Sequence, residues 1–280
     1  MNSNQQRIPR VLSIAGSDSG GGAGIQADLK AFAACGVHGM TAVTAITAQN
    51  TVAVTGVQAI EPEMIAAQVS AVQRDIGVDA VKIGMLGDLA TIRAVDLALD
   101  ELPPGTPIVL DPVMVAESGA VLLDPHARSG LIELLLARCT VVTPNLPEAR
   151  ALAGTGDELD GPELAPLIHA LGPACVVVTG GHRRLATDVF FDGARIVELA
   201  GERYPGGAAH GSGCTHSAVL AARLAWGDDP LEAARIAKQR AAAAVRDGLR
   251  QIGAGTGPVD VLGIRRASAV PVREGAQPRA

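Results

Sequence analysis

The chain has 280 residues, of which 48% are hydrophobic and 19% charged, and its formal net charge is -6. This composition indicates a packed globular protein and excludes an intrinsically disordered one. No Lys/Arg cluster suggests a nucleic-acid partner. No apolar run approaches the ~20 residues of a membrane span, so we expect a cytoplasmic protein without a membrane partner.

Short apolar runs alternate with longer helical patterns along the chain. The runs that fit buried strands are residues 11–15, 42–46, 80–83, 107–110, 140–143 and 175–179. The helical patterns are residues 25–35, 62–74, 89–100, 125–137, 164–171, 215–226 and 230–249. This alternation predicts βαβ units and a mostly parallel sheet covered on both faces. Residues 188–191 and 194–199 flank Asp192-Gly193, which predicts a hairpin and an antiparallel edge.

Residues 11–262 therefore form one expected α/β domain. We expect residues 1–10 to be a flexible N-terminus and residues 263–280, which are rich in Arg, Pro and Ala, to be a disordered tail. In open α/β sheets, ligands bind at the carboxyl ends of the strands. The polar and glycine residues that follow the predicted strands are the candidates for such a site.

A glycine-rich loop, residues 16–24, follows the first strand and opens a helix, with five glycines in nine residues. Glycines let a backbone approach a ligand closely, and the helix N-terminus adds partial positive charge. The loop lacks the Gly-Lys-Ser/Thr of a Walker loop. Nothing acidic lies between Asp28 and Glu61, which excludes the dinucleotide fingerprint. Asp28 is either a helix-start residue or a ligand contact, and Gln49 either a solvated turn residue or a ligand contact.

A second glycine turn, His210-Gly211-Ser212-Gly213-Cys214-Thr215, leads into the helix 215–226. Two glycines at a helix N-terminus expose several N–H groups towards one point, which predicts an anion hole suited to a phosphoryl group. The helix terminus should lower the pKa of Cys214, and a nearby triphosphate should raise it. Ser212 and Thr215 are alternative helix caps.

Two carboxylates follow neighbouring strand patterns: Asp111 ends one, and Glu148 lies just beyond the next. Magnesium binds one or two carboxylates together with substrate phosphates, so the pair is a candidate Mg²⁺ site. The alternative for Glu148 is a favourable interaction with the dipole of a short helix.

Taken together, these segments resemble hydroxymethylpyrimidine/phosphomethylpyrimidine kinase, of the ribokinase-like superfamily. The matching segments are IAGSDSGGGAGIQADLKAF, TAITAQNT, VKIGML, VLDPVMVAESG, VTPNLPEA, TGGH and HGSGCTHSA. The resemblance implies a three-layer αβα sandwich and ATP-dependent phosphorylation of an aminopyrimidine and of its monophosphate, with Mg²⁺. It also implies a homodimer.

The resemblance also assigns roles to individual residues. Asp28 and Gln49 would hydrogen-bond the aminopyrimidine, while Gly16, Met85 and Val113 line its pocket. The expected ATP contacts are Asp111, Glu148, Thr179 and Gly181, and the first two would hold Mg²⁺. The anion hole would be Gly211, Ser212, Gly213 and Cys214, with Cys214 in the place of a catalytic base.

The chain departs from the family pattern at three positions: Thr179 and Glu117 stand where the family usually has lysine, and Arg240 where it usually has an aromatic residue. Our hypothesis is that Arg183 or Arg184 compensates for Thr179. Two other functions remain open: a pyridoxal kinase, and a catalytically impaired pyrimidine-binding regulatory protein.

Overall fold

The structure, a computed structural model, describes residues 7–180 and 186–267. Within these residues nine strands form one sheet in the order β3-β2-β1-β4-β5-β6-β7-β8-β9. The strands are β1 (Arg10–Asp18), β2 (His38–Gln49), β3 (Val54–Ala59), β4 (Ala80–Ile83), β5 (Ile108–Leu110), β6 (Val141–Val142), β7 (Cys175–Val178), β8 (Asp188–Phe191) and β9 (Ile196–Leu199). The central strands are parallel, and β3, β8 and β9 extend the two edges through antiparallel pairs.

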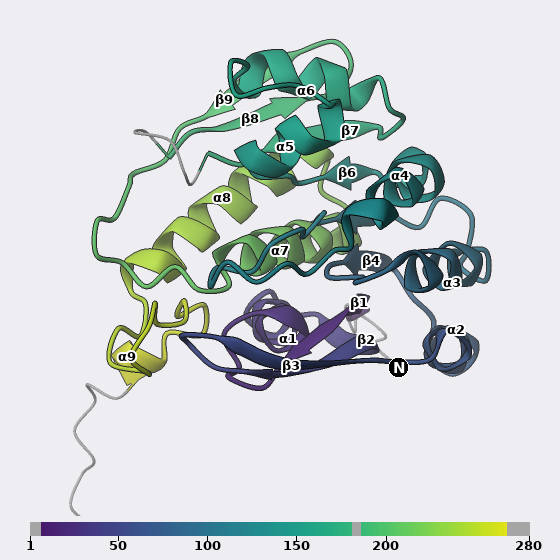
Figure 1. The fold of residues 1–280 in the computed structure, drawn as a ribbon, viewed down its shortest axis with the longest axis horizontal. Coiled ribbons are helices and arrows are strands. Elements are labelled where there is room, and N and C mark those ends of the chain that lie inside the picture. The colour runs from purple at the N-terminus through teal and green to yellow at the C-terminus, as the bar shows by residue number, and fades with distance from the viewer. Residues whose placement is uncertain (1–6, 181–185, 268–280) are drawn as a thin grey trace, which may run out of the picture.

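Helices cover both faces of this sheet (Figure 1). One face packs against α1 (Gly24–Ala34), α7 (Ser212–Trp226) and α8 (Pro230–Arg246). The other packs against α2 (Pro62–Asp75), α3 (Leu89–Leu99), α5 (Leu146–Ala153), α6 (Gly161–His169) and the helical stretch between Pro125 and Arg138. The expected three-layer αβα sandwich is confirmed.

The central strands are mostly apolar because both of their faces are buried. In β1, Leu12 and Ile14 contribute to the core under α2 and α3, whereas Val11 contributes to the core under α1 and α7. Side chains of a strand alternate between its two faces, so one continuous apolar run supplies two cores. No helix of the described residues is long and apolar enough to cross a bilayer.

The helices α7 and α8 pack against each other, and many of their buried residues are alanines. The buried residues there include Ala218, Ala221 and Ala222 on α7, and Ala233, Ala234 and Ala237 on α8. Residues this small allow two helix backbones to approach closely. Asp229 caps α8 by accepting hydrogen bonds from the N–H groups of Leu231 and Glu232, so the second helix starts immediately after the first one ends.

Several elements differ from expectation. The edge strand β3 has no counterpart in the prediction, because its sequence contains Gly56 and its side chains are mostly exposed. The helix expected over 125–137 is instead a series of short turns: 3₁₀ η1 (Pro125–Ala127), α4 (Arg128–Gly130), π-helical η2 (Leu131–Leu135) and 3₁₀ η3 (Leu136–Arg138).

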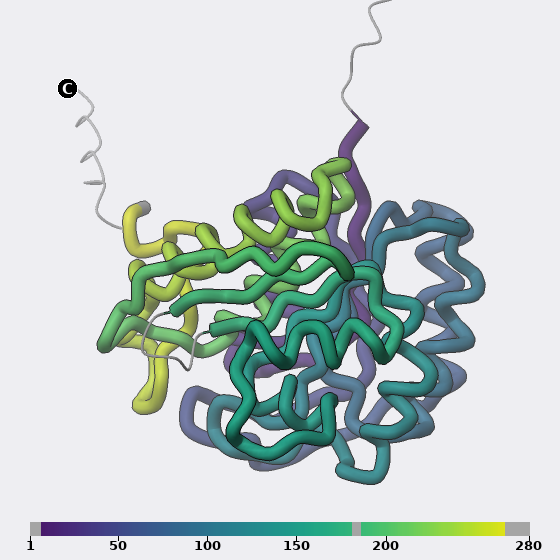
Figure 2. The backbone as a smooth tube through the Cα atoms, turned by 90° about the horizontal axis from the view of Figure 1, so that it is seen from above, coloured from purple at the N-terminus to yellow at the C-terminus, as the bar shows by residue number. Residues whose placement is uncertain are grey.

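The chain termini also differ. Residue Arg10, expected in the flexible N-terminus, begins β1 and forms an ion pair with Asp79. A short helix, α9 (Ile264–Ala267), lies in the expected tail. Residues 1–6 and 268–280 lie outside the described residues. Near the C-terminus, His210 and Pro258 pair as a parallel bridge, so the segment before α7 and the C-terminal segment lie side by side (Figure 2).

Candidate active site

A cavity of about 450 Å³ opens at the carboxyl ends of β1, β5, β6 and β7. It is of the size typical of small-molecule sites. The residues predicted from the sequence that line it are Gly16, Gln49, Met85, Asp111, Val113, Glu148, Thr179, Gly211, Ser212, Gly213 and Cys214. Gly181, Arg183 and Arg184 lie outside the described residues. The glycine-rich loop and the second glycine turn therefore share one cavity.

The second glycine turn begins α7 earlier than expected. Gly211 precedes the helix with φ +82, a conformation that favours glycine, and the helix starts at Ser212 rather than Thr215. No side chain caps this helix, and Ser212 N donates to the carbonyl of Ala209. Gly213 and Cys214 thus lie in an uncapped first turn on the cavity wall, where backbone N–H groups can bind an anion.

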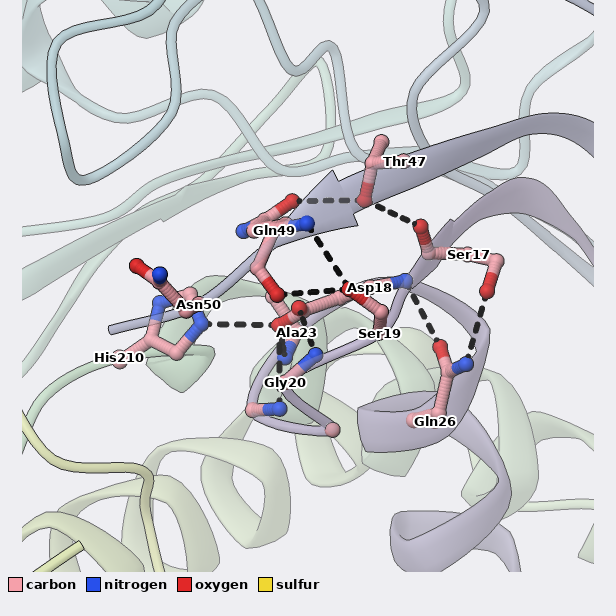
Figure 3. Close-up of polar contacts among 12 residues, drawn as sticks. Ser17, Asp18, Ser19, Gly20, Ala23, Gln26, Thr47, Gln49, Asn50 and His210 are labelled. Atoms are coloured by element: carbon pink, nitrogen blue, oxygen red, sulfur yellow. Dashed lines mark hydrogen bonds and ion pairs between the residues drawn. The ribbon is translucent and has the colours of Figure 1, made fainter. Parts of the chain in front are cut away.

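The glycine-rich loop is held by Asp18, a residue that sequence reasoning did not single out (Figure 3). Its carboxylate accepts hydrogen bonds from the backbone N–H groups of Gly20, Gly22 and Ala23 at 2.8–3.0 Å. His210 Nε2 lies 2.9 Å from Asp18 Oδ2. Burial pushes the pKa of Asp18 upward, but these hydrogen bonds outweigh burial and hold it below its ordinary value.

The side chain of Gln49 lies at the end of β2, on the cavity wall. Its Oε1 accepts a hydrogen bond from Thr47 Oγ1 at 3.2 Å, and its backbone N–H and carbonyl both bond Ser19 Oγ (Figure 3). These contacts hold β2 against the glycine-rich loop. Gly16 lies at an irregularity in the β1–β2 register, beside Met85.

Asp28 does not line the cavity, which corrects the expectation that it contacts a bound ring. Its side chain is fully buried beneath the site, where Lys82 Nζ lies 3.0 Å from both carboxylate oxygens and Ser13 Oγ donates to Oδ2 at 2.6 Å. Burial raises the pKa of Asp28, and the Lys82 cation and Ser13 counteract this in part. Lys82 is itself fully buried. Asp28 is therefore the counterion of a buried lysine.

The Cys214 thiol lies among charged groups that oppose one another. Burial raises its pKa to about 12; the Asp111 and Asp28 carboxylates add to the effect, and the Lys82 cation counteracts it. The lowering expected from the helix terminus is therefore outweighed. In this structure the thiol is protonated at neutral pH.

Asp111 directly follows β5, and Glu148 lies in the first turn of α5, just beyond β6, which pairs with β5. Both are buried, and Ser217 Oγ donates to Asp111 Oδ2 at 3.0 Å. Glu148 also completes the capping box of α5, accepting from the N–H of Asn145 at 2.9 Å. Burial and the Asp111 charge raise the pKa of Glu148 to about 8. Glu148 therefore stabilises the start of α5, and its role in Mg²⁺ binding stays a prediction.

A further polar cluster, missed in the sequence, lies where β7 and β8 meet α7 and α8. Asp188 Oδ1 accepts from Lys238 Nζ at 2.6 Å and from Gly180 N at 2.8 Å, and His216 Nε2 lies 3.5 Å from Asp188 Oδ2. All three side chains line the same cavity as Thr179. Burial lowers the pKa of His216, so it is neutral at pH 7. No pattern in the sequence marks this cluster, because its members come from distant segments.

Two departures from the family pattern fall in different places. Glu117 lines the cavity, on a segment near the antiparallel bridge between Val115 and Val121. Arg240 does not line the cavity and donates to the carbonyl of Ala34 at the end of α1.

Comparisons with known proteins agree with this geometry. The phosphomethylpyrimidine kinase family matches residues 18–260. A hydroxymethylpyrimidine/phosphomethylpyrimidine kinase from Rhizobium meliloti is 50% identical over 255 residues, covering 89% of this chain and 95% of that protein. The pyridoxal kinase from Staphylococcus aureus in complex with ADP is 34% identical with a TM-score of 0.84, covering 93% of this chain and 96% of that one.

A phosphomethylpyrimidine kinase from Clostridium difficile is 38% identical with a TM-score of 0.73, covering 82% of this chain and 96% of that one. The likeness to these kinases supports the ribokinase-like fold expected from the sequence. The chain belongs to the phosphomethylpyrimidine kinase family.

Proposed function

We propose that this protein transfers the γ-phosphoryl group of ATP to 4-amino-5-hydroxymethyl-2-methylpyrimidine and to its monophosphate, for thiamin biosynthesis. The observation that carries the proposal is one cavity with an uncapped helix N-terminus at Gly211–Cys214 and a mixed polar and apolar wall at Gly16, Gln49 and Met85. Relatives named for this activity share up to half of their residues with this chain over most of its length.

The acceptor end of the cavity suits an aminopyrimidine. Gln49 carries both an amide donor and a carbonyl acceptor, which can match a ring nitrogen and an exocyclic amino group. Gly16 offers backbone without a side chain, and Met85 and Val113 add apolar surface for the ring. Asp28 acts here only indirectly, through Lys82.

The phosphate end of the cavity suits a triphosphate. The N–H groups of the uncapped first turn of α7 would stabilise charge on a transferring phosphoryl group; one such donor contributes about 3 kcal/mol. The transition state of this transfer is loose, so positioning and charge stabilisation supply most of the catalysis. Lys238 and Thr179 line the nucleotide end.

Asp111 and Glu148 fit a magnesium site by their chemistry: two adjacent buried carboxylates, both with raised pKa values, whose repulsion a divalent cation relieves. Mg²⁺ would neutralise charge on the phosphates between them. Within the described residues no group of three or more His, Cys, Asp or Glu side chains is arranged to hold a metal ion alone, so nucleotide oxygens would complete the coordination.

Cys214 faces the acceptor alcohol in this proposal. Because its thiol is protonated at neutral pH, Cys214 orients the hydroxymethyl group. The alcohol proton leaves late, as bond formation to phosphorus proceeds, and passes to an oxygen of the transferred phosphoryl group. The experiment compares wild type with Cys214→Ser and Cys214→Ala. Full kcat in Cys214→Ala would exclude any role in the reaction.

The decisive test is a coupled ADP-release assay with hydroxymethylpyrimidine, its monophosphate and pyridoxal in parallel. We expect the highest kcat/KM with the pyrimidine and measurable turnover of its monophosphate. Pyridoxal is included because solved structures named pyridoxal kinase share this fold at 34–39% identity. A preference for pyridoxal would assign the second function, and pyrimidine binding without ADP release would indicate an impaired regulatory protein.

We also propose a cytoplasmic homodimer. Light scattering on the protein as it elutes from a size-exclusion column gives its mass directly. A monomer at micromolar concentration would contradict the homodimer.

A further inference from the structure

Asp18 and His210 connect two parts of the active site that are 192 residues apart in the sequence. Asp18 ends β1 in the glycine-rich loop, and His210 begins the second glycine turn. Their side chains are only 3% and 9% exposed, with His210 Nε2 2.9 Å from Asp18 Oδ2 (Figure 3). Because the Asp18 carboxylate already accepts three backbone N–H bonds, Nε2 carries the proton and donates it to Oδ2.

The glycine-rich loop and the second glycine turn pack directly against each other, without room for a side chain at Gly22 or Gly211. A Cβ at Gly22 would overlap the His210 imidazole, and a Cβ at Gly211 would overlap the carbonyl of Gly22. The absence of side chains at these two positions therefore allows the loops to touch directly. A shift of either loop relative to the other would break the Asp18–His210 hydrogen bond or create a clash.

His210 is itself anchored from a third part of the chain. Its N–H donates to the carbonyl of Gly257 at 3.2 Å, and its carbonyl accepts from Val259 N at 3.1 Å. The C-terminal segment thus fixes the backbone of His210, while Asp18 fixes its ring. Asp18 in turn holds the backbone that follows Gly16 on the acceptor wall.

We propose that the Asp18–His210 hydrogen bond is a positioning device that sets the distance between the acceptor alcohol and the anion hole. The inference rests on the proposed kinase function. The acceptor lies against the backbone that Asp18 holds, and the γ-phosphoryl group lies at the turn that His210 begins. In phosphoryl transfer, reacting atoms need near-attack spacing, and a misplacement of about 1 Å can cost about 100-fold in rate. Neither residue exchanges a proton with the substrates in this scheme.

A matched pair of substitutions at His210 separates this role from a merely structural one. The side-chain amide nitrogen of His210→Gln can reach the place of Nε2, whereas that of His210→Asn is shorter and cannot. We expect His210→Asn to lower kcat about 100-fold while each KM changes less than about 3-fold, and His210→Gln to recover most of the loss. His126→Gln, at an exposed histidine outside the cavity, is the control and should match wild type.

A second readout reports on positioning itself. When the alcohol is misplaced, water can take the γ-phosphoryl group instead, giving ADP and inorganic phosphate. We expect the ratio of inorganic phosphate to phosphorylated pyrimidine to rise in His210→Asn and in Asp18→Asn, and to stay near the wild-type ratio in His210→Gln. A purely structural loss of active protein would lower both products together and leave the ratio unchanged.

Gly22→Ala tests the same contact without removing either polar group, because the added methyl displaces the imidazole. It should lower kcat and raise the phosphate ratio as His210→Asn does. The inference is overturned if the folded His210→Asn and Gly22→Ala variants keep wild-type kcat and product ratio. If wild type releases no phosphorylated pyrimidine or pyridoxal at all, the proposed function fails rather than this inference.

Discussion

Removing the charge of Lys82 should destabilise the protein strongly. Lys82→Met keeps much of the side-chain volume and leaves the Asp28 carboxylate fully buried without its cation. Breaking a buried ion pair from one side costs about 3–5 kcal/mol, because the remaining charge stays uncompensated. For a chain of this size each kcal/mol lowers Tm by about 2 °C, so the expected fall is roughly 6–10 °C.

A double-mutant cycle tests the origin of this loss. Asp28→Asn removes the other charge, and the double variant Lys82→Met/Asp28→Asn should be more stable than Lys82→Met alone, because no unpaired charge remains. The control is Arg74→Met, which breaks the exposed Arg74–Glu101 pair at 3.4 Å and should cost less than about 1 kcal/mol.

Thermal unfolding of the four variants without ligand, followed by KM measurements on the folded ones, decides between two roles for Asp28. If Asp28 contacts the pyrimidine directly, Asp28→Asn should keep the wild-type Tm and raise only the pyrimidine KM. That result would refute the reasoning from burial. A lowered Tm in both single variants, with partial recovery in the double, would support it.

Three further predictions concern the cavity. The pKa of Glu148 is about 8 in the folded state and about 4.5 in the unfolded state. Between these pH values the folded state binds more protons, so the stability of the ligand-free protein falls as pH rises. Glu148→Gln should flatten this part of a Tm scan over pH 5–9, and an unchanged slope would contradict the raised pKa of Glu148. Since the pKa of Cys214 is about 12, its alkylation by iodoacetamide, followed by peptide mass spectrometry, should still accelerate between pH 8 and 10, whereas a plateau near neutral pH would indicate a thiolate. Gln49→Ala should raise the pyrimidine KM more than the ATP KM, and the reverse order in steady-state kinetics would mean that the acceptor lies elsewhere.

The layer architecture was predictable because buried parallel strands must be apolar on both faces. The apolar runs around Leu12, Val81 and Val109 therefore identified the sheet, and the turn residues after them identified its functional edge. Asp111 and Glu148 were placed correctly on neighbouring strand ends, since β5 pairs with β6. The edge strand β3 was not predictable, because an exposed strand carries no continuous apolar signal.

Pairings between distant residues were also beyond sequence reasoning. Asp28 reads as a possible ligand contact, yet its partner Lys82 is 54 residues away and reaches it only after β1 and β4 pair. The same holds for Asp18 with His210 and for Asp188 with Lys238. The sequence motifs predict which segments meet at the site. The Asp28–Lys82 and Asp188–Lys238 ion pairs could not be predicted in the same way, because they depend on how the strands of the sheet pair.

The buried alanines of α7 and α8 should make the proposed anion hole sensitive to remote substitutions. A methyl side chain has no rotamers to exchange, so a larger residue at Ala221 or Ala237 cannot be absorbed by rearranging neighbours. The helices would have to separate as rigid bodies, and the start of α7 would move with them. Phosphate binding at the proposed anion hole would thus depend on Ala221 and Ala237, which do not line the cavity.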